Sequence, residues 1–169
     1  GGLHIYGNLD IDVCKWAFEQ VIRRQESLRT CFEVSKKTEM VRQKIMDQCK
    51  INFEFKDISK KDNSSIQNKE DAQIMMGDFA KKTINLKSLP LFKILLIKIS
   101  KDEYLLALVI HHLVADGWSI GILAQEWAQF YSFKKDSIPM NLESLDIQYS
   151  DYCFEQKKSS INWDEHIDY

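Results

Sequence analysis

The run Tyr104–Ile110, which reads YLLALVI, constrains the fold more than any other stretch of the chain. It is short and uncharged, with a charged turn before it and a polar loop after it, so it predicts a strand buried on both faces. Two adjacent histidines, His111 and His112, follow the run, and the loop after them ends in Asp116-Gly117. The strongest chemical candidates therefore come directly after the most buried element.

An amphipathic helix is expected to begin after that loop. Apolar side chains recur there at helical spacing, at Trp118, Ile122, Leu123, Trp127, Phe130 and Tyr131. Asp116 is a good N-cap for this helix, with Gly117 in its first turn. We therefore expect the two histidines at the carboxyl end of a central strand, facing the N-terminus of a helix, where α/β folds place ligands.

The two histidines are expected to have different roles. Successive side chains on a strand point to opposite faces, so His111 and His112 cannot enter one site or chelate one metal together. A lone histidine at a strand end is usually a satisfied core residue. A buried strand gains nothing from two ionisable rings, however, and the pair is followed by Asp116-Gly117. One ring is expected to be structural and the other chemical.

Composition excludes several classes of function. The 169 residues carry a net charge of −2, with 44% hydrophobic and 28% charged residues, as expected for one globular domain. The chain has no excess of basic residues of the kind that binds nucleic acid. No apolar run approaches the ~18 residues that are needed to span a membrane. The cysteines form no CxxC pair and lie far from the histidines, so we expect no metal site and a reducing cytoplasm. These are Cys14, Cys31, Cys49 and Cys153.

Periodicity predicts the remaining elements. Strands are expected over residues 3–9, 28–34, 39–45, 51–55, 91–99 and 104–112, and helices over 11–25, 68–82 and from 118. The strand 28–34 contains Arg29, which is flanked by Leu28, Thr30 and Phe32. An arginine in a central strand needs a partner, whereas one on an outer face points to solvent, and the pattern leaves both interpretations open.

Four segments carry a resemblance to a known family. HHLVADG, at His111 to Gly117, resembles the HHxxxDG signature of the condensation domains of nonribosomal peptide synthetases. The same signature occurs in a wider superfamily that includes chloramphenicol acetyltransferase. RQESLRTCF, at residues 24–32, resembles RHExLRTxF, with Gln25 where the family usually has histidine. TINLKSLPLFK, at residues 83–93, and IQYSDY, at residues 147–152, resemble PFDLxxxPLxR and the start of QYxDYAxWQR.

The resemblance implies a fold and a reaction. It runs nearly end to end but covers one of the family's two lobes, so residues 1–169 are expected to be the N-terminal lobe, without its upstream start and without the C-terminal lobe. The implied fold is α/β, a two-layer α+β sandwich of the chloramphenicol acetyltransferase type, with a mixed sheet covered by helices. The implied reaction forms an amide between a donor acyl or peptidyl thioester and an acceptor aminoacyl thioester.

The resemblance also implies roles for individual residues. His112 is expected to deprotonate or position the acceptor amine, with His111 as structural support. Asp116 is expected to pair with Arg29 and so hold the loop rigid. The backbone N–H of Gly117, at a helix N-terminus, is expected near the oxyanion.

Partners follow from the same resemblance. The chain itself is expected to bind no cofactor and no metal, because its substrates are carried on the 4′-phosphopantetheine arms of peptidyl and aminoacyl carrier proteins. The other expected partners are the C-terminal lobe and neighbouring synthetase domains.

Three alternatives remain open. The chain could be an acyltransferase that uses coenzyme A and completes its site by oligomerisation, as trimeric members of the superfamily do. It could also be a truncated lobe that folds without catalysing, and we expect the isolated lobe to be inactive. An epimerising or degenerate domain is a further possibility. A Cys–His nucleophile is disfavoured, since Ser119 lies along the next helix and no cysteine has an evident place beside His112.

Overall fold

The centre of the fold is a four-stranded mixed sheet, in a computed structural model that describes residues 1–35, 39–59 and 65–158. In spatial order its strands are β1 (Gly2–Tyr6), β6 (Glu103–Ile110), β5 (Phe92–Ser100) and β4 (Phe53–Asp57). β4 is parallel to β5, and the other neighbours are antiparallel. The predicted hairpin of β5 and β6 forms the middle of this sheet, with Leu96 opposite Leu106.

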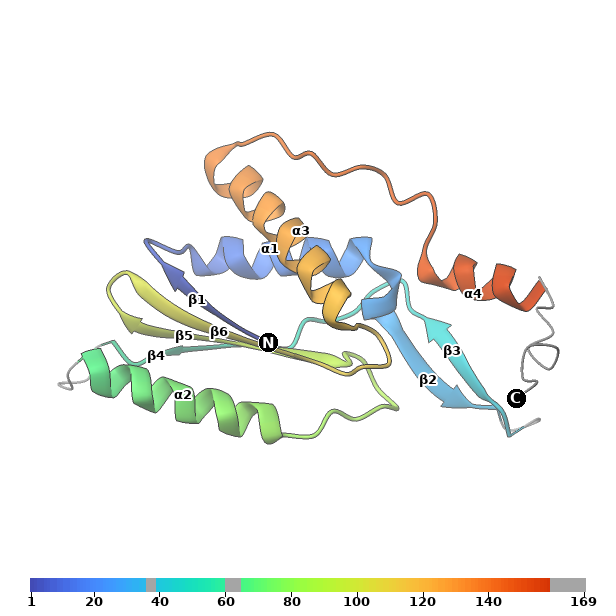
Figure 1. The fold of residues 1–169 in the computed structure, drawn as a ribbon, viewed down its shortest axis with the longest axis horizontal. Coiled ribbons are helices and arrows are strands. Elements are labelled where there is room, and N and C mark those ends of the chain that lie inside the picture. The colour runs from blue at the N-terminus through green and yellow to red at the C-terminus, as the bar shows by residue number, and fades with distance from the viewer. Residues whose placement is uncertain (36–38, 60–64, 159–169) are drawn as a thin grey trace, which may run out of the picture.

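Helices cover both faces of the sheet (Figure 1). α1 (Ile11–Arg24) and α3 (Gly117–Asp136) pack on one face, where one apolar core gathers, and α2 (Ser65–Lys81) packs on the other with a second core. The α/β class with a mixed sheet covered by helices is confirmed. Since both faces are covered, there are three layers where two were expected.

The predicted core positions of α1 and α2 are largely confirmed. Cys14 is fully buried, and this burial raises the pKa of its thiol to about 12, so it is an inert core residue. Phe79 and Ala72 of α2 lie in the second core. Trp118 and Ile122 depart from the predicted apolar stripe of α3, since 82% and 42% of their surfaces are exposed.

A smaller unit lies at one end of the sheet (Figure 1). It consists of the 3₁₀ helix η1 (Glu26–Arg29), the antiparallel pair β2 (Thr30–Val34) and β3 (Val41–Ile45), and α4 (Tyr149–Lys158). The strand predicted over residues 28–34 is therefore wrong in its first two residues, which belong to η1. The long connection between α3 and α4 runs across the top of the molecule in this view.

The described part of the chain contains no helix with the length and hydrophobicity needed to span a membrane.

Candidate functional site

The two histidines come after the end of the central strand, not within it. β6 ends at Ile110, and His111 is anchored at the start of the loop by its backbone N–H, which donates to Leu91 O at 2.9 Å. The His111 ring turns back on this loop, where its Nδ1 accepts the backbone N–H of Leu113 at 3.2 Å. Strand alternation is thus not what separates the histidines. The histidines differ because the His111 ring is bonded to the loop, whereas the His112 ring is not.

His112 lines a cavity of about 290 Å³. Among the residues that the structure describes, none forms a hydrogen bond with the His112 ring, so both ring nitrogens are available to a substrate. The rest of the wall comes from the loop after His112 and from the small unit at the end of the sheet, at Gln25, Ser27, Thr30, Gln43, Leu113, Val114, Ala115, Asp116, Ser119 and Tyr149. The cavity therefore joins the end of the sheet to η1, β2, β3 and α4.

Asp116 fixes the junction between the loop and α3. Its backbone is extended, and its Oδ1 accepts the backbone N–H of Ser119 at 2.9 Å and the Ser119 hydroxyl at 2.6 Å. The Ser119 Oγ in turn accepts the backbone N–H of Asp116 at 3.2 Å, which completes a reciprocal cap. The hydroxyl and the backbone N–H of Ser119 lower the pKa of the Asp116 carboxyl, so the residue is charged at neutral pH.

Gly117 begins α3, as predicted. The first backbone N–H groups of a helix have no partner within the helix and carry the positive end of its dipole. A Cβ added at Gly117 would meet no atom within 4 Å. Nothing in the described chain therefore requires glycine here for space, and a group outside the chain has room to approach this backbone.

The expected pair between Arg29 and Asp116 is absent, and this part of the prediction is wrong. The Arg29 guanidinium donates to three backbone carbonyls, at Ile22 O (3.1 Å), at Arg23 O (3.3 Å) and at Met46 O. Arg29 lies in η1, directly after α1, so its side chain reaches the open carbonyls at the C-terminus of that helix. Asp116 has its own partner in Ser119, and the loop is held from within α3.

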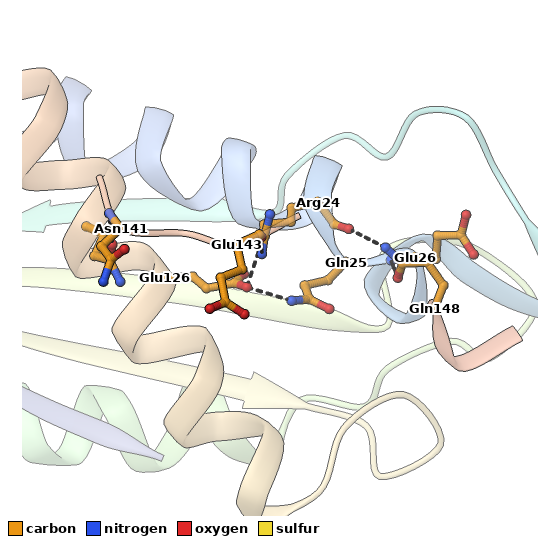
Figure 2. A network of polar contacts seen from close by, with 8 residues as sticks. Arg24, Gln25, Glu26, Glu126, Asn141, Glu143 and Gln148 are labelled. Atoms are coloured by element: carbon orange, nitrogen blue, oxygen red, sulfur yellow. Dashed lines mark hydrogen bonds and ion pairs between the residues drawn. The ribbon is translucent and has the colours of Figure 1, made fainter. Parts of the chain in front are cut away.

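A buried carboxylate joins α3 to the end of α1, beside Gln25 of the cavity wall (Figure 2). Glu126 is 5% exposed, and its Oε1 accepts from Arg24 Nε at 2.8 Å and from Gln25 Nε2 at 2.9 Å. Its Oε2 is buried without a hydrogen-bond partner among the described residues. Gln25, which stands where the related motif usually has histidine, is thus tied to a charged group of α3 while it lines the cavity.

Within the described ranges, no three His, Cys, Asp or Glu side chains are grouped so that they could hold a metal ion.

Comparison with known proteins identifies the family. The Condensation domain family matches residues 2–169. The chain belongs to this family. Surfactin synthase subunit 1 of Bacillus subtilis (strain 168) is 35% identical over 154 residues, which are 91% of this chain and 4% of that protein. Bacitracin synthase 2 of Bacillus licheniformis is 34% identical over 150 residues, which are 89% of this chain and 5% of that protein. The chain thus spans only a small fraction of these relatives.

Solved structures share the fold of this chain. The starter condensation domain of rhizomide synthetase matches with a TM-score of 0.81 at 22% identity, over 95% of this chain and 37% of that one. The X-domain from teicoplanin biosynthesis matches with a TM-score of 0.79 at 21% identity, over 99% of this chain and 34% of that one. The expected correspondence to a partial lobe of a condensation domain is confirmed.

Sequence reasoning missed several residues of this condensation-domain cavity. Tyr149 and Gln25 line the cavity with His112, although they lie over 100 residues apart in the chain. Both fall within or beside the segments that resemble family motifs, and no other signal in the sequence marks them. Thr30 and Gln43 lie on paired strands at the cavity wall, and no local pattern distinguishes them.

Proposed function

We propose that the chain supplies the histidine-bearing half of a condensation site that joins a donor thioester to the amine of an acceptor aminoacyl thioester. The observation that carries this proposal is the His112 ring, which is free of hydrogen bonds from the described residues, at a cavity in a chain of the condensation family. Both substrates are proposed to arrive on phosphopantetheine arms of carrier proteins.

The chemistry needs only a few groups from the protein. A thioester is already activated, so the amine can attack its carbonyl carbon without a covalent enzyme intermediate. A neutral imidazole at His112 accepts a proton from the attacking amine or holds the amine in line through a hydrogen bond. The thiol of the donor carrier arm leaves, and the amide remains on the acceptor.

Asp116 and Gly117 are proposed to support this step from the start of α3. Asp116 is bonded to Ser119 and so fixes the end of the loop that carries His112 to the start of the helix. The backbone N–H of Gly117 is proposed to donate to the oxyanion that forms on the thioester carbonyl, where the helix dipole favours negative charge.

Positioning is proposed to contribute more than proton transfer. Orienting two reactants contributes about 7–11 kcal/mol in well-aligned cases, whereas a general base contributes about 10²–10⁴-fold, or roughly 3–5 kcal/mol. Orientation of two carrier-bound substrates needs walls on both sides of the site. This supports the proposal that a half site alone does not turn over.

The test is amide formation between a donor-loaded and an acceptor-loaded carrier protein. The chain is assayed alone and with a condensation-domain C-terminal lobe added in trans, and the amide product is measured by mass spectrometry. We expect product only when both lobes are present, and none with His112→Ala. Product formation by His112→Ala at the wild-type rate would refute the role of this ring.

A further inference from the structure

The helix α4 packs against neither of the two apolar cores. Its large side chains are mostly exposed, with 60% of Tyr149 and 56% of Tyr152 open to solvent, and none of its described residues belongs to either apolar core. It follows a connection, residues 137–148, that has no regular secondary structure. Apolar packing on the two cores therefore does not fix the position of α4.

Hydrogen bonds from Gln148 take the place of that packing (Figure 2). The Gln148 Nε2 donates to Arg24 O at 3.0 Å, and its Oε1 accepts the backbone N–H of Glu26 at 3.3 Å. Two residues further, the Ser150 hydroxyl donates to Glu26 Oε2 at 2.8 Å. A carboxamide is the side-chain group that donates and accepts from one short planar end, so glutamine suits this position and glutamate does not.

The residue between these contacts is Tyr149, which lines the cavity at His112. Its ring is stacked on Tyr152, with centroids 6.0 Å apart, and so has a defined direction. The neighbouring Cys153 raises the pKa of the Tyr149 phenol, which is therefore neutral at physiological pH. Tyr149 thus presents an uncharged aromatic wall to the cavity.

The same junction fixes another part of the wall. Arg24 and Gln25 are bonded to the buried Glu126 of α3, while the backbone of residues 24 and 26 receives Gln148. One turn of chain at the end of α1 therefore positions both Gln25 and Tyr149 around His112.

We propose that Gln148 is a positioning residue that holds Tyr149 as a wall of the His112 cavity, and that Tyr149 thereby limits the size of the acceptor group that reaches His112. The second half of this statement rests on the proposed function. The first half concerns the structure of the chain alone, so the two are tested separately.

The first experiment measures the wall without any substrate. In Gln148→Ala, amide hydrogen exchange in α4 is expected to become about tenfold faster, as loss of two ordinary hydrogen bonds implies. The matched control is Gln129→Ala, which removes a similar bond to the same connection, at Asn141 N, and is expected to leave exchange in α4 unchanged. Equal exchange in α4 of wild type and Gln148→Ala would overturn the proposal.

The second experiment measures selection of the acceptor. With the C-terminal lobe added in trans, we compare alanyl and tryptophanyl acceptor carriers. Tyr149→Ala and Gln148→Ala are expected to lower the KM for the tryptophanyl acceptor relative to the alanyl acceptor with little change in kcat, and Tyr149→Phe is expected to keep the wild-type ratio.

An unchanged KM ratio in Tyr149→Ala would remove its role in selection. If the wild-type protein forms no amide, the proposed function fails, and the substrate-free experiment still decides the position of Tyr149.

Discussion

At the scale of single residues, the two histidines have different roles, because only the His111 ring forms a hydrogen bond within the loop. We expect His111→Ala to loosen the loop, since it removes the acceptor for Leu113 N–H, and to lower both stability and activity.

His112→Ala should unfold like wild type and lose about 10²–10⁴-fold in amide formation. Thermal unfolding and the two-lobe assay measure these effects. A large fall in unfolding temperature for His112→Ala would contradict the assignment.

Ser119 lowers the pKa of Asp116 through two hydrogen bonds. Because the pKa of Asp116 is lower in the folded than in the unfolded chain, its charged form stabilises the fold above the unfolded-state pKa, and this contribution is lost as pH falls through the folded-state value. Ser119→Ala removes the hydroxyl donor, so the pKa of Asp116 should rise and acid unfolding should begin at higher pH. Carboxyl ¹³C titration measures the shift. Ser132→Ala, in the same helix, is the control and should leave Asp116 unchanged.

The glycine at the start of α3 allows a test of the oxyanion contact. Gly117→Ala should fold normally, because its Cβ meets open space and alanine is favoured in helices over glycine. If substrate approaches this backbone closely, the added methyl should lower amide formation while the unfolding temperature is kept. An unchanged rate in the two-lobe assay would show that the Gly117 N–H is not at the reacting carbonyl.

At the scale of elements, Arg29 is a clamp between α1 and the chain that follows β3. Arg29→Ala removes donors from the carbonyls of Ile22, Arg23 and Met46 and should lower the free energy of unfolding by about 2 kcal/mol. Urea unfolding measures this loss, with the exposed Arg42→Ala as the control. Since Asp116 is held by Ser119, its pKa should be the same in Arg29→Ala and wild type. A higher pKa of Asp116 in Arg29→Ala than in wild type would indicate that Arg29 and Asp116 interact after all.

Arg29 also shows which features of the fold cannot be predicted from the sequence. Continuous apolar runs predict β5 and β6, and apolar side chains at helical spacing predict α1 and α3. A four-residue 3₁₀ turn such as η1 is too short to show a period, so its last residues resemble the start of a strand. The bonds of Gln148 with Arg24 and Glu26 join residues more than 120 positions apart, and such contacts leave no local pattern.

The candidate site is predictable to the same limited extent. His112, Asp116 and Gly117 lie together because they are close in the chain and follow one strand, so the motif predicts their proximity. Gln25 and Tyr149 join them only through the tertiary fold. The partner of Arg29 could not be predicted, because the carbonyls at the end of a helix compete with any carboxylate for a guanidinium.

At the scale of the whole molecule, the chain corresponds to a minor part of a solved condensation domain. It covers 37% of the starter condensation domain of rhizomide synthetase and aligns with 95% of its own length. We therefore expect the isolated chain to fold with the described sheet and to form no amide. Circular dichroism and gel filtration measure the fold and the oligomeric state, and the carrier assay measures turnover.

The oligomeric state separates this expectation from the acyltransferase alternative. A site completed by neighbouring copies would make the lone chain trimeric and able to transfer acetyl groups from coenzyme A to a small alcohol. A site completed by a second lobe would leave the chain inactive until that lobe is added, and activity would then depend on the concentration of the lobe and saturate. Turnover by the chain as a monomer would contradict both, because it would mean that His112 and the walls of one lobe suffice to orient two substrates.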